Sequence, residues 1–156
     1  MPRPRIAILG RFTESASALR YRGVVSSRAL LEVVWAAGGD PVTLLPGDSP
    51  EALDYLFQSG QYGNDPKPVL PTVVILDLNL PKIGGLDVLE RLRANERTHL
   101  VPVVIFTSSD EERDRLRCYE GRANSFVRKP LDFGEFAETV AKLGVYWVAT
   151  NDPPGA

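Results

Sequence analysis

Three polar residues follow apolar stretches of this chain, and their types suit transfer of a phosphoryl group to a carboxylate. Asp77 ends the apolar run VVIL, Thr107 ends the run VPVVIF, and Lys129 follows the short run SFVR. An aspartate can accept a phosphoryl group as a nucleophile, while a lysine and a hydroxyl stabilise phosphoryl oxygens. Each also has an ordinary interpretation, as a turn or capping aspartate, a strand-forming threonine and a solvated lysine. Their occurrence at the ends of three strands favours a shared site.

The elements that would position these residues alternate between strand and helix. Apolar runs predict five strands, at residues 5–10, 41–45, 72–78, 101–106 and 125–128. Capping residues and apolar residues at helical spacing predict five helices, which begin near residues 26, 49, 86, 109 and 132. This alternation indicates an α/β fold with a doubly wound parallel sheet. We therefore predict one flavodoxin-like domain over residues 1–156, a three-layer α/β/α sandwich with strand order 2-1-3-4-5.

The predicted order brings the three polar residues to one edge of the sheet. Asp77 ends the third strand at the switch point of the topology, where open α/β sheets bind ligands. Residues 11–23 are polar and are expected to form a long loop beside it. Capping boxes are expected at Ser109 and Asp132, at the starts of the last two helices.

Composition excludes several classes of protein. The chain has 156 residues and a net charge of -2, so it carries no basic footprint for nucleic acid. It has no apolar run long enough to span a membrane. Its one cysteine, Cys118, cannot form an internal disulfide, which is consistent with a cytoplasmic location. We expect neither nucleic acid nor a membrane as a partner.

Three segments resemble the receiver domain of two-component response regulators: VVILDLNLPKIGGLDVLERLR, VPVVIFTSS and ANSFVRKPLDFGEF. The similarity runs from about residue 48 to residue 156 and implies a role in phosphorelay signalling, with a histidine kinase as partner, rather than an enzyme. The ending around Tyr146 and Trp147 resembles single-domain regulators that partner phytochrome-type kinases. The resemblance also implies a cis peptide bond between Lys129 and Pro130.

The same resemblance assigns a role to each matching residue. It makes Asp77 the phosphoacceptor and the backbone carbonyl of Asn79 a ligand of Mg²⁺. Thr107 becomes the switch hydroxyl, and Phe126 becomes the aromatic residue that changes rotamer with it. Lys129 becomes the phosphate-binding lysine. Receivers associate through their fourth and fifth helices, so either a monomer or a homodimer is expected.

One part of the receiver pattern is missing. Receivers have two adjacent acids after the first strand, which hold Mg²⁺ beside the phosphoacceptor, whereas this chain has Gly10 and Arg11. Arg11 is a candidate ion-pair or anion contact for Asp77, and it would discourage a cation. The nearest acid is Glu14. A site made of Asp77, the Asn79 carbonyl and waters, joined by Glu14 only if its loop folds back, should bind Mg²⁺ weakly. We expect phosphorylation to be impaired.

The first part of the chain resembles a different family. The segments RPRIAILGRF and YRGVVSSRALLEVVWAAGGDPVTLLP, within residues 1–46, are similar to the start of class I glutamine-amidotransferase-like hydrolases. Those enzymes need a nucleophilic cysteine and a His-acid pair, which Cys118 and His99 do not supply. Two incomplete patterns favour an engineered chimera over a natural receiver with a degenerate first strand. The second functional hypothesis is a flavodoxin-like scaffold with no evolved function.

Overall fold

The computed structural model describes residues 5–9, 11–13, 23–25, 28–36, 38–44, 51–64, 70–80 and 83–152. Five strands form the main sheet: β1 (Arg5–Leu9), β4 (Asp40–Leu44), β5 (Val73–Leu76), β6 (Val103–Thr107) and β7 (Ser125–Arg128). The α-helices are α1 (Arg28–Ala36), α2 (Glu51–Phe57), α3 (Gly85–Ala94), α4 (Glu112–Glu120) and α5 (Phe133–Val145). A short 3₁₀ turn covers Gly60–Tyr62, and a π-helical turn, Tyr146–Thr150, follows α5.

The main sheet is parallel throughout, and its strands lie in the order β4-β1-β5-β6-β7. Numbered along the chain without the short strands β2 and β3, this is the predicted order 2-1-3-4-5. The flavodoxin-like fold predicted from the sequence is therefore confirmed. The central strands β1, β5 and β6 end side by side at one edge of the sheet, where register pairs Leu9 with Leu76 and Leu76 with Ile105.

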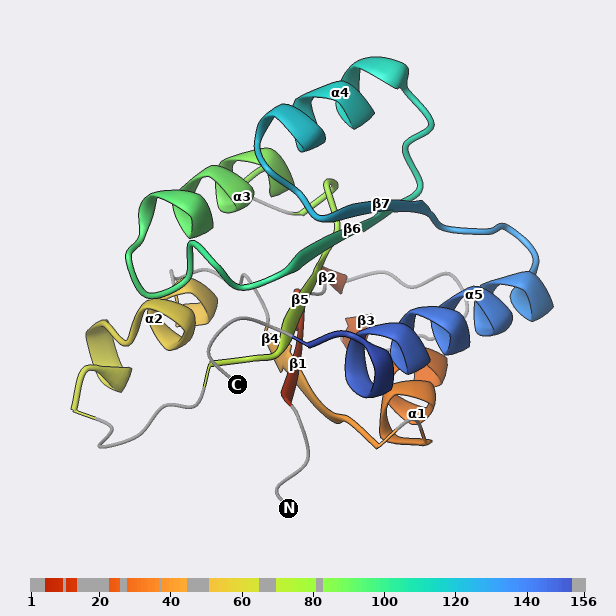
Figure 1. Ribbon diagram of the computed structural model, residues 1–156, viewed down its shortest axis with the longest axis horizontal. Coiled ribbons are helices and arrows are strands. Elements are labelled where there is room, and N and C mark those ends of the chain that lie inside the picture. The colour runs from red at the N-terminus through yellow and green to blue at the C-terminus, as the bar shows by residue number, and fades with distance from the viewer. Residues whose placement is uncertain are drawn as a thin grey trace.

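Side chains that alternate along each strand enter two separate cores. In β5, Val74 and Leu76 pack with residues of α2, α3 and α4, whereas Val73 and Ile75 pack with residues of α1 and α5. Figure 1 shows these two helical layers on opposite faces of the sheet. The central strands β1, β5 and β6 carry apolar residues at successive positions, because helices cover both faces of the sheet.

The helix ends agree with the sequence at some positions and not at others. The Asp132 side chain accepts a hydrogen bond from the Glu135 backbone N at 2.9 Å, as the predicted cap requires. The capping box predicted at Ser109 is wrong, since α4 begins at Glu112 and its N-cap is Glu111. Val140 of α5 and Trp147 of the π-helical turn that follows it are both buried in the core.

Two further expectations are corrected by the structure. Residues 11–23 were expected to form a loop, but Arg11–Thr13 (β2) and Gly23–Val25 (β3) pair as a separate antiparallel two-stranded sheet. The peptide bond between Lys129 and Pro130 is not cis, since the described residues contain no cis bond. Among the same described residues, no helix has the length and apolar character needed to cross a membrane.

Candidate functional site

The three polar residues singled out in the sequence meet at one edge of the sheet. Asp77 directly follows β5, Thr107 is the last residue of β6, and Lys129 directly follows β7. Because β5, β6 and β7 are neighbours in a parallel sheet, these ends lie next to one another. The predicted convergence of an acid, a hydroxyl and an amine is therefore present in the structure.

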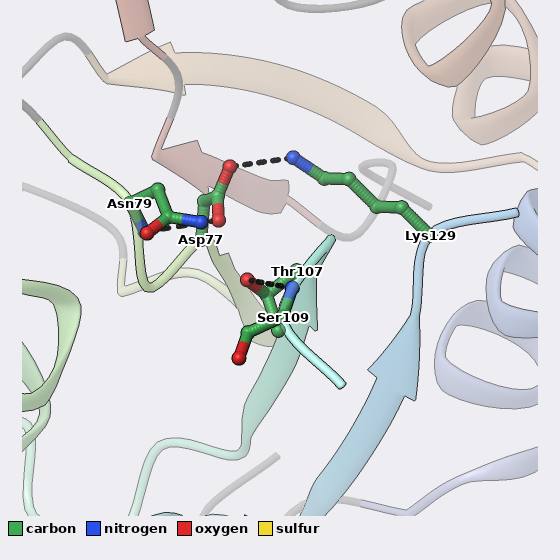
Figure 2. Close-up of polar contacts among 5 residues, drawn as sticks. All are labelled: Asp77, Asn79, Thr107, Ser109 and Lys129. Carbon is green, nitrogen blue, oxygen red and sulfur yellow. Dashed lines mark hydrogen bonds and ion pairs between the residues drawn. The ribbon is translucent and has the colours of Figure 1, made fainter. Parts of the chain in front are cut away.

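Asp77 is held by one contact on each carboxylate oxygen. Its Oδ2 accepts a hydrogen bond from Lys129 Nζ at 2.5 Å, and its Oδ1 accepts one from the backbone N of Asn79 at 3.1 Å. Figure 2 shows the Lys129 side chain extending from the end of β7 across to Asp77. The side chains keep 15% and 31% of their accessible surface, for Asp77 and Lys129 respectively, so the ion pair is partly shielded but open to a reactant.

Lys129 is positioned from both ends of its side chain. Its backbone N donates a hydrogen bond to the Thr107 carbonyl at 2.7 Å, which fixes the start of the loop after β7. Its Nζ lies 5.6 Å from the centroid of the Phe106 ring, within range of a cation–π contact. The ammonium group is therefore held over the carboxylate rather than left to move in solvent.

Thr107 is fully buried, and its hydroxyl is engaged locally. Thr107 Oγ1 accepts a hydrogen bond from the backbone N of Ser109 at 3.3 Å, as drawn in Figure 2. Phe126 lies in β7, paired in register with Ile105, and packs against the core that contains α3 and α4. The predicted change of rotamer at Phe126 stays a prediction.

Gly85, the first residue of α3, supports the site. A Cβ at Gly85 would meet the backbone of the Asp77 loop, because it would lie 2.3 Å from the Asp77 carbonyl oxygen and 2.6 Å from Leu78 Cα. Gly85 N also donates a hydrogen bond to the Leu78 carbonyl at 3.0 Å. Only glycine allows α3 to approach the phosphoacceptor loop this closely. The signal in the sequence was a glycine eight residues after the candidate aspartate.

The described residues do not complete a magnesium site. Mg²⁺ requires near-octahedral oxygen coordination, and the described part of the chain contains no group of three His, Cys, Asp or Glu residues that could hold a metal. Asp77 and the exposed Asn79 are present, but the backbone of Arg11 belongs to β2 and its side chain lies outside the described residues. Glu14 also lies outside them, so the contacts predicted for both residues stay predictions.

Cys118 does not have the properties of a hydrolase nucleophile. It is fully buried on α4, and burial raises the pKa of its thiol to about 11, with the nearby Asp114 carboxylate acting in the same direction. A raised pKa disfavours the thiolate, which is the reactive form.

Comparison with known sequences identifies relatives over most of the chain. Residues 48–141 match the response regulator receiver domain family. A probable methanogenesis regulatory protein, FilR2 of Methanothrix harundinacea, is 39% identical over 108 residues, covering 69% of this chain and 67% of FilR2. The response regulator Rcp1 of Synechocystis is 32% identical over 130 residues, covering 83% of this chain and 86% of Rcp1.

Solved structures give the same result. The Mn(2+)-bound form of response regulator Rcp1 has a TM-score of 0.77 and 28% identity, covering 99% of this chain and 100% of that one. The bacteriophytochrome response regulator AtBRR has a TM-score of 0.56 and 35% identity, covering 96% of this chain and 98% of AtBRR.

These similarities do not divide the chain into two families. The alignment with Rcp1 is longer than the chain from residue 47 onward, so it extends into the first part. The resemblance of residues 1–46 to amidotransferase-like hydrolases, and the chimera inferred from it, receive no support from any of these relatives. The chain has the strand order of a receiver, an aspartate–lysine pair at the ends of its third and fifth main strands, and relatives across its length. It belongs to the response regulator receiver domain family.

Proposed function

We propose that Asp77 accepts a phosphoryl group from a phosphohistidine of a histidine kinase. The observation that carries this proposal is the 2.5 Å contact between Asp77 Oδ2 and Lys129 Nζ at the carboxyl edge of the sheet. A carboxylate that must accept a phosphoryl group needs a cation nearby, because negative charge accumulates as the two anions approach. Lys129 is that cation, and its partial shielding strengthens its effect.

The proposed transfer exchanges one bond to phosphorus for another. A carboxylate oxygen of Asp77 attacks phosphorus, the P–N bond to the kinase histidine breaks, and the electron pair of that bond stays on the imidazole nitrogen. Lys129 then stabilises the phosphoryl oxygens, and the Thr107 hydroxyl donates to one of them after rotating about its χ1 bond.

We propose that this domain binds Mg²⁺ weakly. Related Rcp1 has been solved in a Mn(2+)-bound form, but the position after β1 in this chain carries Gly10 and Arg11 in place of two acids. Asp77, the Asn79 carbonyl and Glu14 together supply too few charged ligands for a tight octahedral site. We therefore expect slow phosphorylation. Among the described residues, Lys129 is the cation that offsets the negative charge of Asp77 and the incoming phosphoryl group.

The proposed role is that of a phosphoacceptor in signalling rather than an enzyme with its own substrate. The similarity to the bacteriophytochrome response regulator AtBRR supports a phytochrome-type histidine kinase as the donor. A cytoplasmic location fits this role, because the histidine kinase that donates the group uses ATP. The single cysteine, Cys118, is buried and forms no disulfide, which fits the same compartment.

Intact-mass spectrometry after incubation with acetyl phosphate and Mg²⁺ tests the phosphoacceptor directly. A phosphoryl adduct is expected in the wild-type protein and not in Asp77→Asn, and it should form more slowly in Lys129→Met. An adduct that persists in Asp77→Asn would overturn the assignment of Asp77. A cooperatively folded wild-type protein that gives no adduct at any Mg²⁺ concentration would instead support the alternative, a receiver fold that has lost its chemistry.

A further inference from the structure

A hollow of about 400 Å³ lies between α3 and α4, which are neighbours on one face of the sheet (Figure 1). Leu86 and Leu89 of α3 give it an apolar lining, while Arg117 of α4 and Arg122, two residues after α4, give it positive charge. We propose that this hollow binds a small monoanion with an apolar ring, of the class of aromatic carboxylates. The carboxylate would contact Arg117 and Arg122, and the ring would lie on the two leucines.

The lining of the hollow includes a point where α3 and α4 touch. Leu89 is buried, and a Cβ at Gly121 would lie only 2.9 Å from Leu89 Cδ2. The absence of a side chain at Gly121 therefore lets the end of α4 approach α3 closely. Pockets that bind small molecules have volumes in this range and combine an apolar lining with a few charged groups. The hollow has both properties.

Arg93 holds a positive charge at one end of the hollow by bonds to uncharged groups. Its Nε and Nη2 donate hydrogen bonds to the Arg122 carbonyl at 3.0 and 2.8 Å, and Nη2 also donates to Asn124 Oδ1 at 2.9 Å. Its Nη1 donates to the carbonyls of His99 and Val101 at 3.2 and 2.9 Å. These bonds use the five N–H groups of the guanidinium. None of the acceptors is a carboxylate, so the charge of Arg93 is not neutralised by them.

Arg122 adds a second positive charge near the first. Burial lowers the pKa of the Arg93 guanidinium, and the charge of Arg122 acts in the same direction. The two guanidinium groups therefore repel each other, and an anion bound near both would relieve this repulsion. Arg117 and Arg122 are exposed, and neither forms an ion pair with another described residue. Their N–H groups are thus open to a ligand.

Two glutamates limit the charge that the hollow can accept. Glu90 and Glu120 also line it, so three arginines and two glutamates leave an excess of one positive charge. This balance favours a ligand with one negative charge, since a second negative charge would lie near a glutamate. Guanidinium groups also stack on aromatic faces. Both properties favour a monoanion with a ring over a polyanion.

The arginine end of the hollow lies away from the phosphoacceptor. Arg93 binds Val101, two residues before β6, and Asn124, directly before β7. Asp77 and Lys129, in contrast, follow the other ends of β5 and β7. Because the strands are parallel, these two positions lie at opposite edges of the sheet. The proposed site therefore does not depend on phosphorylation of Asp77.

Titration of ¹⁵N-labelled protein with 2-naphthoate, followed by NMR, tests the site. Saturable amide shifts are expected within residues 86–94 and 117–122. The neutral 2-naphthamide should bind about tenfold more weakly or worse, because it lacks the charge-assisted contact with the arginines. The dianion 2,6-naphthalenedicarboxylate should bind no more tightly than 2-naphthoate. Tighter binding of the dianion, shifts centred on Asp77 and Lys129, or no saturable shift would overturn the proposal.

Variants at exposed positions test the arginines. Arg117→Gln combined with Arg122→Gln should weaken binding of 2-naphthoate about tenfold or more, since both contacts with the carboxylate are lost. Arg113→Gln is the matched control, because Arg113 is an exposed arginine of α4 that faces Glu111 at 3.7 Å and does not line the hollow. It should leave the affinity unchanged. Equal weakening by Arg113→Gln, or full affinity in the double variant, would show that the arginines of the hollow do not form the site.

A last variant tests the space rather than the charge. Ala94 is an exposed residue of the lining at the end of α3, so Ala94→Leu should fill part of the hollow and keep the fold. We expect it to weaken binding of 2-naphthoate about three- to tenfold, because the ring and the new side chain would compete for the same volume. Unchanged affinity in this variant would overturn the placement of the ring in the hollow.

Discussion

Residues 5–44 and residues 70–152 both build the main sheet, but they contribute unequally to the site. Strand β1 lies between β4 and β5, and its residues Ile6 to Leu9 are as buried as those of β5. After β5 the chain continues with Asp77, and after β1 it continues with Gly10 and Arg11. The pairing of strands depends on apolar side chains and backbone hydrogen bonds, so it tolerates any residue that follows the strand. The chemistry of the site, in contrast, depends on which residue follows each strand.

The difference also affects the electrostatics of the site. Three carboxylates at one edge of a sheet repel one another unless a metal ion is bound. Without the two acids after β1, Asp77 has a single described charged partner, Lys129, and the two charges balance. The absence of an acid pair after β1 therefore removes a source of repulsion at this edge of the sheet.

The largest effects are expected from truncating the core on the two sides of this comparison. Leu9 in β1 and Leu76 in β5 are register partners in the same core, at 3% and 0% exposure. Leu9→Ala and Leu76→Ala should each lower the free energy of unfolding by about 2–5 kcal/mol, because each leaves a cavity. Urea denaturation followed by circular dichroism measures both.

Cooperativity decides what this pair of variants means. The chain has two tryptophans; Trp35 lies on α1 and Trp147 follows α5. Variants with a single tryptophan, made by Trp35→Phe or Trp147→Phe, should report the same urea transition. A small effect of Leu9→Ala together with separate transitions would show that the first part packs as an independent unit, and would refute a core shared by β1 and β5.

A second prediction concerns the loop that carries Asp77. Gly85→Ala should destabilise the protein by about 1–3 kcal/mol, because the new methyl group overlaps the backbone of Asp77 and Leu78. Gly84→Ala is the matched control, since its Cβ would lie 3.3 Å from a carboxylate oxygen of the Asp87 side chain, which can move. Thermal unfolding should separate the two, and equal shifts would show that the close approach is not what requires glycine.

The third prediction restores the missing chemistry to the first part. Gly10→Asp combined with Arg11→Asp should tighten binding of Mg²⁺ or Mn²⁺ at least about tenfold, because β1 and β5 end side by side and the added carboxylates supply ligands. Titration calorimetry measures the change, and Arg11→Gln separates removal of a cation from addition of ligands. Binding that does not improve would mean that the chain after β1 does not reach Asp77.

The site was predictable where strand patterns are strong. The apolar runs before Asp77, Thr107 and Lys129 predict neighbouring strands, and a parallel sheet brings their ends together without further information. Contacts made by backbone atoms were not predictable, since the residue type of Ser109 does not indicate that its backbone N would reach Thr107. The close approach at Gly85 likewise depends on how α3 packs.

Short elements and local similarity caused the remaining errors. β2 and β3 have three residues each, too few to show the alternation that predicts a strand, so their pairing was read as a loop. The similarity of residues 1–46 to another family rested on a β-α-β unit that flavodoxin-like folds share. Such a unit carries the same apolar pattern in unrelated proteins, so it supports a fold more strongly than an origin.

The smallest effect is expected at Cys118, which can separate opening of α4 from unfolding of the whole domain. Burial raises the pKa of the thiol to about 11, so native thiolate at pH 8 is about one part in a thousand, and labelling by a disulfide reagent must wait for α4 to open. If α4 opens locally, Leu9→Ala should change the labelling rate by less than about twofold despite its large global effect. A rate that rises in proportion to the lost stability would show that α4 opens only with the whole domain.

The pH dependence of stability gives an independent measure of the same thiol. The folded protein keeps its thiol proton up to about pH 11, whereas the ordinary value is 9.0, so the unfolded chain releases its proton first. Stability should therefore fall as pH rises from about 9 towards 11, and it should fall less in Cys118→Ala. Comparing the two proteins cancels the titration of lysines and tyrosines. Identical slopes would mean that α4 leaves Cys118 open to water, which would also remove the barrier on which the labelling experiment depends.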